Sequence, residues 1–444
     1  MARSLRRLKT ETSVTPDVLN DVQRHCLPLT SDADLAPLIQ RIGDAKLALL
    51  GEASHGTSQF YKWRCRITQQ LLLNQNFSFI AVEGDWPDCY RLNRFVKGYP
   101  DAGKNAQEVL SHFHRWPTWM WANEEVARFL EWLKDYNKDR PMDKKVGFYG
   151  LDVYSLWESM NFLANHRSEL PEEATEALQK VIKCFSPYNE EPQDYAHASR
   201  FYSCEKEVSA LVDRLTRLTI DAGHTESEAA FNTQQNAFAV QSAEGYYRIM
   251  MKGGPDSWNL RDTHMMDTLD RLMDFHGPES RGIVWAHNTH VGDARFTDML
   301  DEGEINIGQL ARERYQEQQV ALVGFGSHHG TVTAGRSWDA PMETMRMPSG
   351  RTGSWEDILH RTTPADKLLI FSGLEHEAVF MDPRGHRAVG VVYRPEMEHL
   401  GNYVPTILAR RYDAFLFIDE TSALRVLGVH AEGHQVPDTY PFTV

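Results

Sequence analysis

The sequence predicts an α/β fold with a mainly parallel central sheet flanked by helices and an inserted, mostly helical subdomain. Up to about residue 155, strand-like apolar runs alternate with amphipathic stretches, as in repeated βα units. The segment 156–276 is helical in pattern, and strand signals then resume. A chain of 444 residues also exceeds what one core usually organises. We therefore predict that 35–155 and 277–430 form one α/β core, with 156–276 as a subdomain covering its cleft.

Five of the expected strands end on polar side chains. They are Leu49-Leu50 before Glu52 and His55, Phe79 to Val82 before Glu83 and Asp85, Val146 to Tyr149 before Asp152, Ile283 to Ala286 before His287 and His290, and Val320 to Phe325 before Ser327, His328 and His329. The carboxyl ends of parallel strands share one edge of a sheet, and ligands bind just outside that edge. The sequence therefore predicts a functional site there.

Other elements follow from apolar spacing and from Pro and Gly breaks. Helices are expected at Glu172 to Phe185, Phe201 to Ala222 and Glu226 to Met251, after a first helix carrying Arg64 and one starting near Asn123. Further strands are expected at Lys367 to Phe371, Ala388 to Tyr393 and Ala414 to Ile418.

Composition restricts the partners and the compartment. Lys and Arg number 47 against 62 Asp and Glu, a net charge of −15, which argues against nucleic acid or an anionic membrane as partner. The chain has no apolar run near 18 residues, and its basic start (1–9) lacks the apolar segment of an export signal. Five cysteines without a Cys-x-x-Cys pair predict free thiols. We expect a cytoplasmic protein, and its oligomeric state stays open.

Glu52 and His55 are the first catalytic candidates. Histidine exchanges protons near neutral pH, and a carboxylate from Glu52 or Glu83 would hold its ring in the tautomer that accepts a proton from water. The alternative is structural, with Glu52 capping the next helix and His55 in an ordinary turn.

His287 and His290 form a His-x-x-His just past another expected strand, facing the same edge. Together with Glu52, His55 and Glu83 they suit proton transfer. They suit a zinc, manganese or iron site equally well, since imidazole and carboxylate are the usual ligands of these metals.

Two arginines and a tryptophan cluster each have two interpretations. Arg64 and Arg261 either form structural salt bridges or point to the edge, where a guanidinium binds a carboxylate or stabilises an oxyanion. Trp116 and Trp119 either pack in the core or line a cleft for a large, partly apolar substrate.

Several motifs are missing. The chain has no Gly-x-Ser-x-Gly elbow, no phosphate loop and no Gly-x-Gly-x-x-Gly fingerprint, so serine-esterase, nucleotide and nicotinamide chemistry lose their support. Attack of an activated water on a carbonyl is the simplest remaining chemistry.

A set of motifs resembles the erythromycin esterase family. The set comprises Gly51 to Thr57 followed by Phe60 and Arg64, Val82 to Asp85, Gly150 to Asp152, Arg261-Asp262 with Met265, and Ala286-His287-Asn288 with His290. The similarity runs from about residue 35 to 430 and is weakest in the helical segment.

The resemblance implies a hydrolase that opens a macrolactone or similar bulky ester with histidine-activated water, without a metal, another cofactor or a covalent intermediate. It makes His55 the base, with Glu52 and Glu83 orienting it, Arg64 organising the carboxylates, and His287 and His290 lining the opposite side. We expect Trp116, Trp119, Asp152 and Arg261 to contact the substrate, a small-molecule ester.

The segment Arg387 to Glu396, with Gly401 to Tyr403 and Arg410 to Ala414, looks more like a broad branch of this family than like its macrolide-resistance members. The ester itself therefore stays open. Two alternatives remain: a metal-dependent hydrolase using the same His and Glu residues, and a binding protein on the same scaffold.

Overall fold

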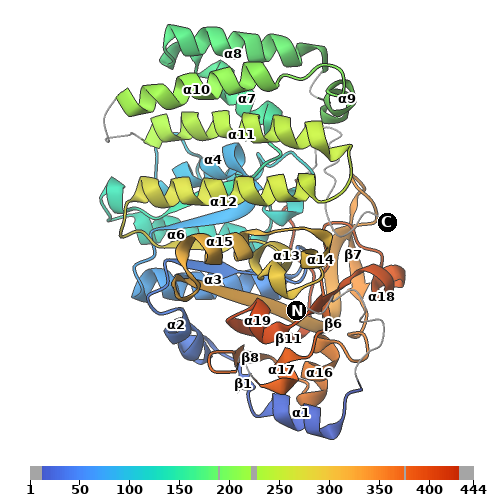
Figure 1. The fold of residues 1–444 in the computed structure, drawn as a ribbon. Helices are drawn as coiled ribbons and strands as arrows, with labels where there is room; N and C mark the ends of the chain where they lie inside the picture. Colours follow the sequence, from blue (N-terminus) through green and yellow to red (C-terminus); the bar gives the residue numbers. More distant parts are fainter. Residues whose placement is uncertain (1–12, 189–190, 222–227, 375–376, 430–444) are drawn as a thin grey trace.

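A computed structural model describes residues 13–188, 191–221, 228–374 and 377–429 (Figure 1). The basic start of the chain, residues 222 and 226 of the expected helices, and residue 430 lie outside these ranges. Within the described residues, nine strands form one sheet in the order β1-β8-β11-β6-β2-β5-β3-β4, with β7 paired to β6. All neighbours from β11 to β4 run parallel. The predicted fold class is confirmed.

The strands, in chain order, are β1 (Leu27–Pro28), β2 (Leu47–Leu50), β3 (Phe79–Asp85), β4 (Gly147–Asp152), β5 (Gly282–Trp285), β6 (Val320–Gly335), β7 (Met342–Met347), β8 (Lys367–Ile370), β9 (Arg384–Arg387), β10 (Tyr403–Thr406) and β11 (Ala414–Thr421). The longer helices are α1 (Pro16–Gln23), α3 (Ser58–Asn74), α4 (Trp86–Lys97), α6 (Glu124–Asn137), α7 (Leu156–Asn165), α8 (Glu172–Phe185), α10 (Glu205–Asp221), α11 (Glu228–Met250), α12 (Asp256–His276), α15 (Ile307–Tyr315) and α16 (Trp355–Thr362). The shorter ones are α2 (Ala36–Ile42), α5 (Ala106–Leu110), α9 (Pro192–Ala198), α13 (Asn288–Val291), α14 (Met299–Glu302), α17 (Ala378–Met381), α18 (Glu398–Gly401) and α19 (Leu408–Arg411).

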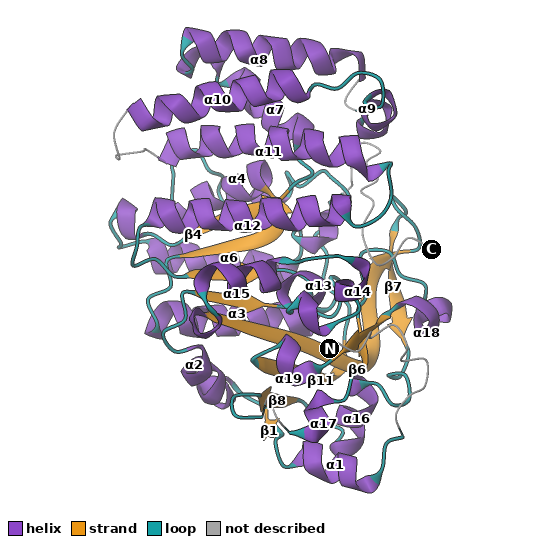
Figure 2. Cartoon of the chain, viewed as in Figure 1, coloured by secondary structure: helices purple, strands orange, loops and turns teal. Residues whose placement is uncertain are grey.

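The sheet is buried on both faces, which explains why its central strands read as continuous apolar runs. In β2, Ala48 and Leu50 belong to one core, while Leu47 and Leu49 belong to the other. Helices α3 and α6 pack on the first face, and α12, α15 and α16 pack on the second. Figure 2 shows these helices on both sides of the strands. Burial on both faces fixes the register of β2 and hence where its carboxyl end delivers the next residues.

The helices α7 to α11 are stacked beyond the sheet, at the top of Figure 1. They share a core of their own, to which Trp157 of α7, Leu178 of α8 and Val240 of α11 contribute. By contrast, α12 sends Met265 and Leu269 into the core on the sheet. The division at 155 and 276, and the idea that the helical segment covers the cleft, stay predictions.

Cysteine pairing differs from the expectation of free thiols. Cys184 at the end of α8 forms a disulfide with Cys204, just before α10. Cys26, Cys65 and Cys89 are free. The wide spacing of the cysteines concealed this pair because the two residues meet only when α8 and α10 pack together.

Two strand predictions were wrong. The run Val320 to Phe325 does not end before Ser327, because β6 continues to Gly335 by pairing with β11 and then with β7. The segment 388–393 is not a strand. It follows β9, and makes single bridges from Val389 to Ser54 and from Val392 to Gly335 instead of a ladder.

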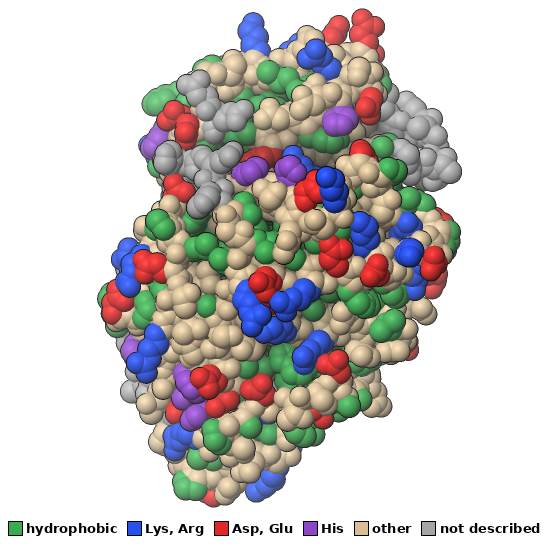
Figure 3. Space-filling view, turned by 180° about the vertical axis from the view of Figure 1, so that it is seen from behind, with side chains coloured by type: hydrophobic (Ala, Val, Ile, Leu, Met, Phe, Trp, Pro, Cys, Tyr) green, Lys and Arg blue, Asp and Glu red, His purple; other side chains and the backbone are tan. Residues whose placement is uncertain are grey.

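The surface agrees with the composition. On the face in Figure 3, acidic and basic side chains are interspersed, and the described side chains form no broad basic expanse. No helix in the described ranges is long and apolar enough to cross a membrane.

Candidate active site

A cavity opens at the carboxyl ends of the central strands. The space between its walls, open mouth included, is about 760 Å³. Its walls contain His55, Glu83, Gly84, Asp85, Asp88, Phe113, Arg115, Trp116, Pro117, Met120, Trp121, Asp152, Tyr154, Arg261, His287, Thr289, His290, Trp338, Gly390 and Val391. Side chains from four of the predicted strand ends therefore meet in one place, and the fifth, at Ser327, does not join them.

The loop after β2 places His55 in the wall of this cavity. Nδ1 of His55 lies 2.9 Å from Oε1 of Glu52, and both side chains are buried. A carboxylate accepts hydrogen bonds only, so Nδ1 carries the proton in this pair when the ring is neutral. Nε2 then holds a lone pair, as a general base requires.

Arg64 holds the other oxygen of Glu52. Its Nη2 lies 2.8 Å from Oε2 of Glu52, and its side chain is fully buried. The guanidinium carbon also lies over the rings of Tyr61 and Trp285, at 4.2 and 5.2 Å from their centroids. Arg64 does not line the cavity, so it acts on His55 through Glu52.

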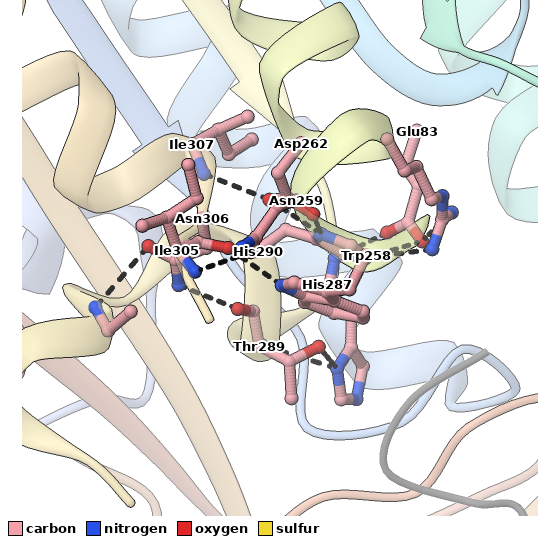
Figure 4. A network of polar contacts seen from close by, with 12 residues as sticks. Glu83, Trp258, Asn259, Asp262, His287, Thr289, His290, Ile305, Asn306 and Ile307 are labelled. Carbon is pink, nitrogen blue, oxygen red and sulfur yellow. Dashed lines mark hydrogen bonds and ion pairs between the residues drawn. The ribbon is translucent and has the colours of Figure 1, made fainter. Parts of the chain in front are cut away.

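His287 faces His55, with ring centroids 4.8 Å apart. The backbone N–H of Thr289 donates to Nδ1 of His287 at 3.3 Å, and the Thr289 hydroxyl lies 2.8 Å from the same atom (Figure 4). Burial, and then the neighbouring His55, hold the pKa of His287 well below its ordinary value. With Nδ1 accepting from Thr289, the neutral His287 carries its proton on Nε2, and a hydrogen bond to the backbone of Ala53 offsets part of the lowering of its pKa.

Glu83 lies between two cationic groups. Its Oε1 accepts from Nη2 of Arg261 at 2.8 Å and lies 3.3 Å from Nε2 of His290. Its Oε2 accepts from the backbone N–H of His287 at 2.8 Å. Burial raises the pKa of Glu83, but His290 and His55 outweigh burial and hold that pKa well below its usual range. Glu83 is therefore an anchored carboxylate near His287, and Glu52 is the residue that orients His55.

His290 is held from the side away from Glu83. Nδ1 of His290 lies 2.9 Å from Oδ2 of Asp262, and the indole of Trp258 stacks on its ring with centroids 4.5 Å apart (Figure 4). Burial lowers the pKa of His290, but Asp262 and Glu83 outweigh burial and raise it to about 9. His290 is therefore a second fixed cation beside Glu83.

Asp152 and Arg261 both reach the cavity, but they bind each other there. Arg261 donates through Nε and Nη2 to the two oxygens of Asp152, at 2.9 and 2.7 Å. Asp152 accordingly positions Arg261. Because Nε and Nη2 are engaged with Asp152, only the rest of the guanidinium is available to contact a substrate.

The two predicted tryptophans lie in different places. Trp116 lines the cavity and donates from Nε1 to the carbonyl of Ala340 at 3.0 Å. Trp119 does not line it, being buried in the core on one sheet face. Trp119 lies in a short 3-10 turn, residues 118–120, outside the cavity wall, so of the two expected substrate contacts that of Trp116 stays a prediction and that of Trp119 has no place in the wall.

Three charged wall residues, Asp85, Asp88 and Arg115, were not among the predicted catalytic and substrate-binding residues. Nε of Arg115 lies 2.5 Å from Oδ2 of Asp85. Burial, followed by the charge of Asp85, raises the pKa of Asp88 to about 7. Asp85 ends β3 and Asp88 lies one turn into α4, so their positions at a strand end were a usable signal. Nothing in the sequence pattern pointed to Arg115.

The arrangement disfavours a divalent metal among Glu52, His55, Glu83, His287 and His290. Nδ1 of His290 is engaged with Asp262 and Nε2 with Glu83, and the guanidinium of Arg261 lies among the carboxylates that would be ligands. The carboxylates are already paired with the positive charges of Arg261 and His290, so they are not free to bind a divalent ion.

Comparison with known proteins adds a family. A sequence profile of erythromycin esterases matches residues 73–421. The match begins after the loop that carries Glu52 and His55 and includes the other strand ends. Erythromycin esterase type II of Escherichia coli is 20% identical over 411 residues, 84% of this chain and 94% of that protein. A putative hydrolase of Bacillus subtilis, YbfO, is 20% identical over 431 residues, 90% of each chain.

Solved structures share the fold. A Bacillus cereus protein superposes with a TM-score of 0.75 at 19% identity, over 94% of this chain and all of that one. A mutant of the erythromycin esterase EreC, in its open conformation, gives a TM-score of 0.64 at 16% identity, over 90% of this chain and 96% of that one.

Proposed function

Because the chain belongs to the erythromycin esterase family, we propose that it is a hydrolase that cleaves a bulky, partly apolar ester with water activated by His55. The observation that carries the proposal is the hydrogen bond between His55 and Glu52 at the wall of the cavity. Glu52 holds the proton on Nδ1, so Nε2 accepts a proton from water in the cavity.

The reaction follows from these positions. His55 takes a proton from water, and the resulting hydroxide adds to the ester carbonyl. The carbonyl oxygen becomes an oxyanion, and collapse of this intermediate breaks the carbon–oxygen bond to the alcohol. The leaving alkoxide takes the proton back from His55. The products are a carboxylic acid and an alcohol, or one opened chain if the ester lies in a ring.

His287 is suited to stabilise the oxyanion. Its ring is neutral, carries its proton on Nε2 and lies beside His55 at the cavity wall. A donor already fixed in a buried site stabilises developing charge without reorganising. Arg261 and His290 add positive charge behind Glu83 on the same side.

The apolar part of the wall supports a large substrate. Phe113, Trp116, Trp121 and Trp338 line the cavity beside the polar groups. Aromatic walls with a few convergent polar groups are typical of sites for sizeable organic molecules. Macrolactones belong to this class, and we propose them as the first substrates to test.

The test is mass spectrometry of erythromycin incubated with the wild type and with His55→Ala. We expect a mass gain of one water, about 18 Da, with the wild type and none with the variant. Hydrolysis at an equal rate by the variant contradicts the base assignment. If a panel of macrolactones and simpler bulky esters is not hydrolysed at all, the esterase proposal fails.

A further inference from the structure

A cluster of metal-binding side chains lies apart from the cavity. His328 of β6, His360 of α16 and Asp419 of β11 bring one ligand atom each within 4.8 Å of one another. None of the three lines the cavity, so the proposed hydrolysis does not use them. We propose that this cluster binds one divalent transition-metal ion of the zinc class, and that the ion ties α16 to the two strands.

Three elements bring the cluster together. In the register of β6 and β11, Ile418 pairs with Ser327 and Glu420 with His329, so His328 and Asp419 are side-by-side neighbours on adjacent parallel strands. Helix α16 packs on both strands (Figure 1), and the ring of His360 stacks on that of His328 with centroids 3.7 Å apart and planes 8° apart. An ion held there would cross-link three elements that are distant in sequence.

The donor types fit a metal of this class. Imidazole nitrogen and carboxylate oxygen are common zinc ligands, with bonds of about 2.0–2.2 Å. Nδ1 of His329 lies 3.1 Å from Nδ1 of His328. His329 is not one of the three grouped donors, so this hydrogen bond between two imidazoles orients the ring of His328.

The cluster is close to the size that one ion needs. Its three donor atoms lie within 4.8 Å of one another, and two donors on one zinc ion are at most about 4.4 Å apart, twice the bond length, so a small movement of one side chain suffices. His360 has the room to move, because its side chain is 31% exposed and lies on a helix edge. Its Nδ1 already lies 2.7 Å from Oδ1 of Asp419, a carboxylate–imidazole pair of the kind that orients metal ligands.

The surroundings also favour a cation. The backbone N–H of Asp419 donates to Oδ1 of Asp366 at 2.9 Å, so a second carboxylate lies close to the cluster. The guanidinium of Arg387 donates to the backbone carbonyls of Ser327 and His328 and to Glu398. The ammonium of Lys367, whose charge reaches Asp419, is held by the carbonyl of Leu359 and the hydroxyl of Thr362. Three imidazoles packed together repel one another when protonated, whereas a shared metal ion binds them in their neutral form.

Calorimetric titration of chelator-treated protein with zinc chloride tests the proposal. We expect about one equivalent of zinc per chain and a higher thermal transition with zinc. His360→Ala and Asp419→Asn each lower the affinity by about 100-fold or more and abolish the thermal shift. His197→Ala, which removes an exposed histidine of α9, leaves both unchanged.

Asp419→Asn preserves side-chain size, and circular dichroism verifies that each variant is folded. The proposal is overturned if the wild type takes up no zinc, or if zinc binds both variants as tightly as it binds the wild type. It is also overturned if zinc uptake is lost in His55→Ala but kept in His360→Ala, because the ion would then lie in the cavity.

Discussion

Arg261 donates two hydrogen bonds to the two oxygens of Asp152, at 2.9 and 2.7 Å, and its Nη2 also donates to Glu83. One planar group thereby joins the ends of β3 and β4 to helix α12. A lysine at this position would carry the same charge, but its single nitrogen could not bind both oxygens of Asp152 in this forked geometry.

The first prediction concerns that geometry. Arg261→Lys lowers kcat by about 100-fold, because Glu83 shifts and takes the backbone of His287 with it. Steady-state kinetics on the best substrate measure the loss. Arg128→Lys, an exposed arginine of α6, is the matched control and keeps full activity. Wild-type kinetics in Arg261→Lys would show that the fork is not needed.

The second prediction concerns Glu52. Glu52→Gln lowers kcat by about 1,000-fold, because an amide also donates hydrogen bonds and no longer fixes the proton on Nδ1 of His55. The double variant Glu52→Gln with His55→Ala is no slower than His55→Ala alone, since both residues act through one base. Independent, multiplicative losses in the double variant argue against this coupling.

The third prediction concerns the buried charge of Arg64. Arg64→Met lowers the free energy of unfolding by about 3–5 kcal/mol, because it leaves the carboxylate of Glu52 buried without its cation. Urea denaturation measures the change. Adding Glu52→Gln to Arg64→Met recovers part of the loss, and the exposed change Arg128→Met costs less than about 0.5 kcal/mol. If Arg64→Met alone leaves the free energy of unfolding unchanged, the ion pair with Glu52 does not stabilise the fold.

The fourth prediction concerns pH. The folded protein raises the pKa of His290 from 6.5 to about 9, so folding binds this proton more tightly. The resulting stabilisation, on the order of 3 kcal/mol, is complete below about pH 6.5 and is lost as pH rises through about 9. Unfolding free energies across this range should fall in the wild type more steeply than in His290→Gln. Parallel curves for the two proteins contradict the assignment.

Much of the fold was predictable because it depends on local patterns. The apolar run of β2 and the residues that follow it, Glu52 and His55, form one strand end, and four such ends do meet at the cavity. The same reasoning failed at Ser327, since the length of β6 depends on pairing with β7 and β11, which no local pattern reveals.

The site was predictable in its residue types more than in its contacts. Trp116 and Trp119 are equally good wall candidates by sequence, yet Trp116 lines the cavity and Trp119, in the short turn of residues 118–120, does not. Arg115 meets Asp85 across 30 residues, and Cys184 meets Cys204 between two helices. Such pairs arise from tertiary packing, so the sequence offers no periodic signal for them.

The loop that carries His55 is held by backbone at Gly56. The backbone N–H of Thr333 in β6 donates to the carbonyl of Gly56 at 3.0 Å, and a Cβ at Gly56 would lie only 1.8 Å from the carbonyl oxygen of Thr333. In a directed-evolution experiment, position 56 would therefore accept no replacement. Diversity aimed at new substrates belongs instead on Trp338 and Val391, which line the cavity and take no part in this contact. The fold thus separates the loop at Gly56, whose sequence must stay constant, from wall residues whose side chains can change without disturbing that loop.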